Sequence, residues 1–329
     1  MNDLSSGLLM PGNSEKRNPG ISLDLDWVEA VRVNRSAVER RCSTLVKRRS
    51  IKKEWQAAWL LKAIRCMDLT TLSSDDTPGR VQRLCSKALR PLKQELLDDL
   101  GIRSLKITVG AVCVYHSLVE TAVKVLQGSG IPVAAVSTGF PHGLNPMPRR
   151  IEEIQDSVAA GAQEIDIVIT RAHVFSGNWD ALYQEIKSFR EACGPAHLKT
   201  ILGTGELGSL RNVAKASLVC MMAGADFIKT STGKEPVNAT LPVSLTMLRM
   251  IRDYHQQTGH VVGFKPAGGI RTAKQALEWQ ILIKEELGRE WLEPELFRFG
   301  ASGLLTDIER QLEHFVTGRY SAAYRQPMG

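Results

Sequence analysis

Short apolar runs alternate with longer amphipathic stretches along most of this chain, and no other feature limits its fold as strongly. Eight such runs lie at residues 64–69, 107–114, 131–138, 164–169, 198–203, 226–231, 261–266 and 296–301. Near-continuous apolar runs are typical of parallel strands that are buried on both faces, and the stretches between them predict helices. Eight strands of this kind predict an α/β fold, a closed (β/α)8 TIM barrel.

The competing α/β architecture is a doubly wound open sheet. That fold typically carries a GxGxxG turn after an early strand, and the sequence contains no such turn. The absence favours the barrel.

The sequence outside the barrel predicts three further segments. Residues 1–24 are rich in Gly, Pro, Asn and Ser and predict a flexible segment. Residues 25–62 predict a basic helical extension, 63–318 the barrel, and 319–329 a C-terminal tail. The Arg and Lys residues of the extension allow two interpretations, a solvated helical face that covers one end of the barrel or an arm that binds RNA or a partner.

Composition bounds the class of protein. The chain is 43% hydrophobic with a formal net charge of +7, which fits a globular protein and is too weak a basic balance to indicate nucleic-acid binding. No apolar run approaches the roughly 20 residues of a membrane span, and the N-terminus does not resemble a signal peptide. Six scattered cysteines without a CxxC pair predict buried thiols in a reducing compartment. We therefore expect a cytoplasmic protein with no membrane partner.

Charged residues interrupt the predicted strands, where an unpaired charge is costly. They are Asp68, Asp166, Lys199, Lys229 and Lys265. Lys229 and Lys265 end neighbouring strands, so their side chains are expected to lie close together. A nearby like charge and burial both lower a lysine pKa and yield a nucleophilic amine that can form a Schiff base with a carbonyl. The alternative is that each lysine forms an ion pair with Asp166 or Asp68.

Glycines gather directly after the last three predicted strands. Gly233, Gly268 and Gly269 lie in these loops, Gly300 lies at the end of the last predicted strand, and Ser302 directly follows that strand. Loops after the last strands of a barrel commonly bind phosphate through backbone N–H groups. The sequence therefore favours a phosphate site, and the alternative is that the glycines only form tight turns.

No pattern indicates a metal or another cofactor. The seven histidines show no HExxH or HxH spacing, so we expect neither. Cys113 lies in the second predicted strand without an evident histidine partner. A buried thiol is favoured over a nucleophile.

Four segments together resemble the deoxyribose-phosphate aldolase family, and most closely its eukaryotic branch. They are 226-DFIKTSTGK-234, 261-VVGFKPAGGIR-271, 163-QEIDIVI-169 and 68-DLTTL-72, and the likeness spans roughly residues 60–327. The resemblance implies a metal-free class I aldolase on a (β/α)8 barrel. Such an enzyme reversibly cleaves 2-deoxy-D-ribose 5-phosphate to D-glyceraldehyde 3-phosphate and acetaldehyde in deoxyribose phosphate catabolism. It also implies a homodimer as the possible assembly.

The resemblance further implies a role for each matched residue. Lys229 matches the Schiff-base lysine, Lys265 the second lysine of the active site and Asp166 the acid/base carboxylate. Tyr324 is the nearest match to a C-terminal tyrosine that acts as a proton relay in some members. The remaining substrate-binding positions are expected at Asp68, Thr70, Cys113, Lys199, Gly233, Gly268, Gly269, Gly300 and Ser302.

Two rival functions stay open at this point. One is a different Schiff-base lyase on the same barrel, such as a transaldolase or a keto-acid aldolase, which a sugar-substrate assay would separate. The other is a protein that keeps the fold but uses its basic extension to bind RNA or a partner. The second rival predicts a dispensable Lys229 and an affinity that falls steeply with salt.

Overall fold

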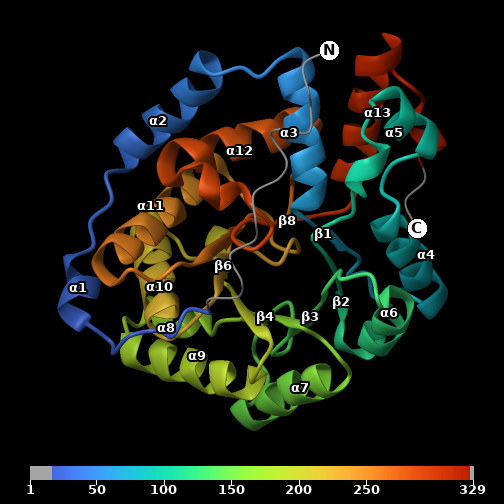
Figure 1. Cartoon of the computed structure of the whole chain (residues 1–329). Coiled ribbons are helices and arrows are strands. Elements are labelled where there is room, and N and C mark those ends of the chain that lie inside the picture. Colours follow the sequence, from blue (N-terminus) through green and yellow to red (C-terminus); the bar gives the residue numbers. More distant parts are fainter. Residues whose placement is uncertain (1–16, 327–329) are drawn as a thin grey trace.

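The eight predicted runs form the eight parallel strands of a single sheet in the computed structural model, which describes residues 17–326 (Figure 1). The strands are β1 (Met67–Thr70), β2 (Ala111–Tyr115), β3 (Val133–Ser137), β4 (Glu164–Val168), β5 (His197–Ile201), β6 (Phe227–Lys229), β7 (Gly263–Lys265) and β8 (Phe299–Ala301). Their order is β7-β6-β5-β4-β3-β2-β1-β8. Two isolated parallel bridges, Phe264 to Phe297 and Ala267 to Gly300, join β7 to β8. The predicted (β/α)8 barrel is confirmed.

Helices follow the strands and form the outer layer of the barrel (Figure 1). They are α4 (Pro78–Leu89), α5 (Gln94–Asp99), α6 (Val119–Leu126), α7 (Met147–Ala159), α8 (Arg171–Phe175), α9 (Trp179–Cys193), α10 (Leu210–Met222), α11 (Leu241–Thr258), α12 (Ala273–Leu287) and α13 (Gly303–Thr317). Short 3-10 turns lie at η2 (Arg103–Leu105), η3 (His116–Leu118), η4 (Thr204–Glu206), η5 (Arg289–Leu292) and η6 (Ala323–Arg325).

Local sequence fixes where several of these helices begin and end. Thr272 and Gln275 form a reciprocal capping box at the start of α12, which satisfies backbone N–H groups that have no partner within the helix. Gly259 ends α11 with a φ of +73°. Glycine adopts this left-handed conformation without steric cost.

The predicted helical extension consists of α1 (Leu25–Ala30), α2 (Arg35–Arg48) and α3 (Lys53–Arg65). It wraps the outside of the barrel, with α1 against α10, α2 against α11, and α3 against α12 and α13 (Figure 1). Because α3 continues to Arg65, the first strand begins three residues later than the predicted run at 64.

Some of the basic residues of the extension form ion pairs with the barrel. Arg41 lies 3.4 Å from Glu285 and 3.3 Å from Glu286, and Arg49 lies 3.1 Å from Glu285. Both glutamates belong to α12. These contacts favour the interpretation of a helical face that covers the barrel over that of an RNA-binding arm.

The segment before α1 is anchored at residues 17–24, which corrects the predicted flexibility of 1–24 over this part. Asn18 is only 3% exposed. Its side-chain amide donates to the carbonyls of Met221 (2.7 Å) and Ala225 (2.9 Å). Its carbonyl oxygen accepts from the Tyr254 hydroxyl at 3.1 Å. The amide thus satisfies carbonyls at the end of α10, a role that composition could not reveal, and residues 1–16 lie outside the described residues.

Replacing Asn18 with alanine is expected to lower the free energy of unfolding by about 1–3 kcal/mol, because buried carbonyls lose their donors. Chemical denaturation of the two proteins measures the difference. Asn34→Ala is the comparison, because Asn34 is an exposed cap of α2 that makes one side-chain hydrogen bond, to the backbone of Ala37. An Asn18 variant as stable as the parent would show that this anchor contributes nothing.

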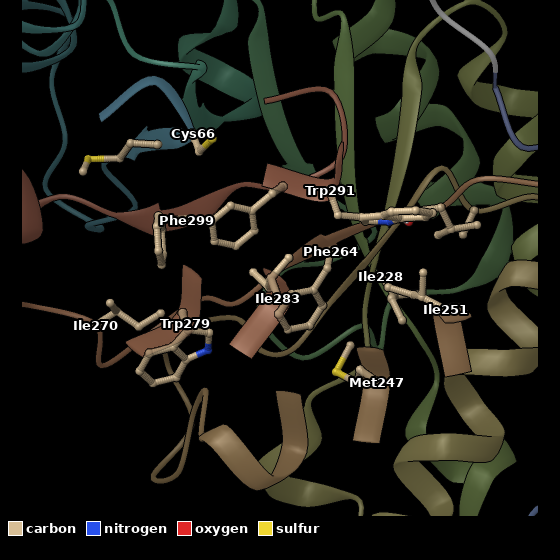
Figure 2. Packing of buried hydrophobic residues seen from close by; sticks show 14 of the residues in the cluster. Cys66, Ile228, Met247, Ile251, Phe264, Ile270, Trp279, Ile283, Trp291 and Phe299 are labelled. Carbon is tan, nitrogen blue, oxygen red and sulfur yellow. Dashed lines mark hydrogen bonds between the residues drawn. The ribbon is translucent and has the colours of Figure 1, made fainter. Parts of the chain in front are cut away.

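The apolar core lies between the strands and the helices. Ile228 of β6 and Phe264 of β7 point outward and pack among Met247, Ile251 and Ile283 of the surrounding helices (Figure 2). This arrangement leaves the interior of the barrel free for polar side chains. All six cysteines are buried and free, as predicted, and no helix within residues 17–326 is long and apolar enough to cross a membrane.

Candidate active site

A cluster of charged side chains fills the interior of the barrel. Asp68 comes from β1, Asp166 from β4, Lys199 from β5, Lys229 from β6 and Lys265 from β7. Lys229 and Lys265 are register partners on neighbouring strands, as are Asp166 and Lys199. The sequence-predicted proximity of the two strand-end lysines is therefore present, and all five residues are at most 3% exposed.

One carboxylate oxygen is shared by the two strand-end lysines. The Nζ atoms of Lys229 and Lys265 each lie 2.7 Å from Oδ2 of Asp166. Lys265 also donates to Oδ2 of Asp68. The ion pairs with Asp166 and Asp68, which were the alternative prediction, are therefore present together with the close pair of lysines.

The two lysines differ in protonation, although they lie side by side. Burial lowers the pKa of Lys229, and the cation of Lys265 adds to this effect against the attraction of Asp166. Burial also acts to lower the pKa of Lys265, but Asp166 and Asp68 together outweigh it and raise that pKa. The surroundings therefore favour the free amine at Lys229 more than at Lys265, a division that the sequence did not predict.

Asp166 is held as a carboxylate. Burial disfavours its charge, yet the three cations Lys199, Lys229 and Lys265 keep its pKa well below the usual value. Its Oδ1 atom is buried and accepts no hydrogen bond, although the Nζ atom of Lys199 lies 3.2 Å away. Asp166 therefore has one engaged oxygen and one oxygen open to a further donor.

Lys199, which was predicted as a substrate-binding residue, lies in the same buried cluster as Lys229 and Lys265. Its side chain is fully buried, and its ammonium donates to Glu164. Burial opposes its charge, but the surrounding carboxylates raise its pKa. The structure thus makes Lys199 a fixed cation within the cluster.

The remaining polar positions on the first strands have local partners. The Thr70 hydroxyl donates to the carbonyl of Asp68 at 2.7 Å. Cys113 is fully buried beside Ala134 and Val136, and burial raises the pKa of its thiol. This agrees with the favoured interpretation of Cys113 as a buried thiol. Within residues 17–326, no group of three His, Cys, Asp or Glu residues is arranged to hold a metal ion.

The predicted glycine loops meet at the carboxyl ends of β6 and β7. The Ser231 hydroxyl donates to the carbonyl of Ala267 at 2.8 Å, which ties the two loops together. Gly233, Gly268 and Gly269 have φ values of +84°, +81° and +84°. A Cβ at Gly268 would lie 2.6 Å from the side chain of Asn238, whereas one at Gly269 would have no atom within 4 Å. Gly269 therefore faces open space at this end of the barrel.

Gly300 and Ser302 differ in what surrounds them. A Cβ at Gly300 would lie 2.8 Å from that of Ala267 and 3.3 Å from Cε of Lys265, so close packing beside the lysine requires glycine there. Ser302 precedes α13, and its side chain makes no capping hydrogen bond. The first backbone N–H groups of α13 thus open at the same end of the barrel as Gly269.

Tyr324 lies apart from the cluster. Its side chain is 86% exposed in η6, while the charged cluster is buried within the barrel. The structure does not bring this predicted relay residue to the lysines.

Two members of the cluster were missed by the sequence analysis. Glu164 contacts Lys199, and Arg298 lies 2.6 Å from Asp68 and 2.8 Å from Glu164. The signal was available in the two-residue period of a strand. Glu164 lies two positions before Asp166, and Arg298 lies two positions before Gly300.

Comparisons with known proteins agree with this site. A profile of the DeoC/LacD family of aldolases matches residues 62–289. The chain is 61% identical to the deoxyribose-phosphate aldolase of Mus musculus over 94% of its length and 98% of the relative's. It is 59% identical to that of Homo sapiens with the same coverage.

A comparison with a solved structure supports the assignment of the fold. The deoxyribose phosphate aldolase of Aeropyrum pernix, whose structure is tetrameric, superposes with a TM-score of 0.57 at 21% identity and covers 85% of this chain and 99% of its own. Both proteins therefore have the same barrel. Because the family profile matches most of the barrel and the close relatives match nearly the whole chain, the protein belongs to the DeoC/LacD family of aldolases.

Proposed function

We propose that this protein is a deoxyribose-phosphate aldolase that reversibly cleaves 2-deoxy-D-ribose 5-phosphate through a Schiff base on Lys229. The observation that carries the proposal is the pair of lysines on one carboxylate oxygen, with the pKa of Lys229 lowered and that of Lys265 raised. An amine with a lowered pKa, next to a fixed ammonium and a carboxylate, can supply the nucleophile, the acid and the base that this reaction needs.

The reaction begins at the open-chain sugar. The Lys229 nitrogen adds to the C1 aldehyde, and loss of water gives an iminium. This cation develops beside Asp166, whose charge is already held in place, so the charge is stabilised without reorganisation of the site. The iminium then accepts the electron pair of the C2–C3 bond.

Proton transfer follows from the same contacts. As the C2–C3 bond breaks, the C3 hydroxyl loses its proton to Asp166, directly or through a water, and Lys265 holds that carboxylate in position. D-glyceraldehyde 3-phosphate leaves, and an enamine stays on Lys229. Protonation of the enamine at C2 and hydrolysis of the resulting iminium release acetaldehyde and restore the amine.

The phosphate is assigned to the open end of the barrel. The backbone around Gly268 and Gly269, with the first turn of α13, offers N–H groups to an anion. The position of Ser302 at the start of α13 adds a hydroxyl. An anion held here orients the sugar so that C1 lies at Lys229 and the reaction becomes effectively intramolecular.

Incubation with 2-deoxy-D-ribose 5-phosphate tests the function directly. The purified protein should release acetaldehyde and D-glyceraldehyde 3-phosphate in equal amounts, and should condense them in the reverse direction. Fructose 6-phosphate and pyruvate-derived keto acids serve as rival substrates. Turnover of either rival without cleavage of deoxyribose phosphate would replace this proposal with a transaldolase or a keto-acid aldolase.

Gly269→Val is expected to impair cleavage of the phosphorylated sugar far more than cleavage of unphosphorylated deoxyribose. A valine would occupy the open space where the backbone meets the phosphate, and glycine alone lacks a Cβ. The kcat/KM values for the two substrates measure the effect.

Gly259→Val is the matched control, because Gly259 also has a positive φ and open space, but lies at the end of α11 before the start of β7. It reproduces the backbone strain without touching the loops. If both variants lose the same proportion of activity on both substrates, the Gly269 loop does not bind the substrate phosphate.

We also propose a cytoplasmic location and a homodimer. Six buried free thiols fit a reducing compartment. Sedimentation equilibrium of the purified protein tests the assembly, and a mass that is not twice that of the 36.3 kDa chain would contradict it.

A further inference from the structure

Arg298 and Glu164 extend the buried charges away from the reacting lysines. Arg298 donates to Asp68 at 2.6 Å and to Glu164 at 2.8 Å, and Glu164 in turn accepts from Lys199. Glu164 begins β4 and Arg298 directly precedes β8, and both residues line a cavity of about 1510 Å³ at the amino ends of the strands. The pair therefore separates this cavity from the lysines near the carboxyl ends.

The cluster contains one cation more than it has carboxylates. Arg298 and Lys265 each contact two carboxylates, and Lys199 contacts three. Lys229 contacts one, Asp166, and shares its Oδ2 atom with Lys265. With every group ionised, four cations would face three carboxylates and leave a net charge of +1.

A net charge buried in a barrel is costly. The cation with the fewest carboxylate contacts is therefore the first to lose its proton. By this count, Lys229 becomes neutral and the cluster reaches zero charge. Loss of Arg298 alone or of Glu164 alone would change this count by one charge, although neither residue contacts the amine of Lys229.

We propose that Arg298 and Glu164 are a positioning pair whose opposite charges balance each other, so that the cluster keeps one excess cation and Lys229 is the group that gives up its proton. The proposal rests on the proposed function, because that amine is the nucleophile. Under this proposal, two residues at the opposite end of the barrel from the substrate influence the pH at which Lys229 loses its proton.

The charged and titratable groups that act on Lys229 are few. Asp166, Lys265 and Cys113 act on it directly. Lys199 contacts Asp166 and Asp68 contacts Lys265, so the five groups come from five strands. Burial keeps the Cys113 thiol protonated, so it adds no charge. The Arg298–Glu164 pair supplies the next charges beyond this set, one of each sign.

Charge-removing substitutions in the pair should move the titration of Lys229 in opposite directions. Arg298→Gln removes a cation, so Lys229 should hold its proton to higher pH. Glu164→Gln removes an anion, so the proton should leave at lower pH. Each shift should be about one pH unit, the order expected for a single charge that acts from beyond direct contact at an effective dielectric constant of about 20.

Reductive ethylation of Lys229 by acetaldehyde and cyanoborohydride provides the readout, because it requires only a free amine. The extent of labelling at Lys229, measured by peptide mass from pH 5 to 9, gives the midpoint for each variant. The acid limb of kcat/KM for deoxyribose 5-phosphate should shift by the same amount in parallel. Arg298→Lys keeps the cation and should leave the midpoint in place, while the double variant Arg298→Gln/Glu164→Gln should return it to the parent value.

Opposite shifts in the two single variants, with return in the double variant, would establish the proposal. If neither midpoint moves, or both move the same way, the pair is only structural and the proposal is wrong. Should one single variant fail to fold, the sign of the shift in the other decides. Failure of the proposed function is distinct, because the parent itself would then neither cleave deoxyribose phosphate nor be labelled at Lys229.

Discussion

Lys229→Ala is expected to abolish cleavage of deoxyribose 5-phosphate while the barrel stays folded. Alanine removes the nitrogen that forms the iminium, and no other amine of the cluster is free, because Lys265 and Lys199 are held as ammonium groups by their carboxylates. The substitution also leaves three cations on three carboxylates, so no buried charge is stranded. Steady-state cleavage, with circular dichroism as the check on folding, measures the outcome.

Borohydride trapping identifies the reacting atom in the parent protein. Substrate and borohydride should attach two carbons to Lys229 and to no other lysine. Lys47→Ala is the control variant, because Lys47 is an exposed lysine of α2 and its loss should change neither turnover nor labelling. Labelling of Lys265 in the parent would reverse the assignment of the two lysines.

Asp166→Asn is expected to lower kcat by about 10²–10⁴, the usual range for a lost acid/base group. Asparagine keeps the shape of the carboxylate but cannot accept the proton of the C3 hydroxyl. It also removes the charge that both strand-end lysines share at 2.7 Å. Substrate binding should change much less, because the phosphate loops are untouched. Separate measurement of kcat and KM distinguishes a loss of turnover from a loss of binding.

The same substitution removes one carboxylate partner from each of Lys199 and Lys265 and the only one from Lys229, and breaking a buried ion pair typically costs about 3–5 kcal/mol of stability. Chemical denaturation of the Asn variant must therefore accompany the kinetics, so that a folded fraction is assayed. An unchanged kcat with a raised KM would mean that Asp166 only positions the substrate.

Most of the barrel could be predicted from sequence because a parallel strand buried on both faces has an unmistakable composition. The run at 164–169 became β4 with nearly the same limits. The run at 64–69 was placed too early, because Ile64 and Arg65 continue the helix α3. An apolar residue at such a junction fits either element, and only tertiary packing decides between them.

The reacting residues could be predicted from the sequence, but the charge balance around them could not. Lys229, Lys265 and Asp166 stand near the ends of apolar runs, where a charge has no structural purpose of its own. Arg298 and Glu164 lie at the start of theirs, where a charge normally reaches solvent. Their burial and their contacts depend on strands far apart in sequence, so the protonation of each lysine could not be derived before the structure.

The anchor at Asn18 has a consequence for how the protein is made. Its hydrogen bonds reach Met221, Ala225 and Tyr254, which lie between 203 and 236 positions later in the chain. A ribosome that adds about 5–20 residues per second needs at least about ten seconds to synthesise that stretch. The segment around Asn18 is synthesised early and is thus among the last to dock. Throughout that interval the Asn18 amide has no partner, because the carbonyls at the end of α10 have not yet been made.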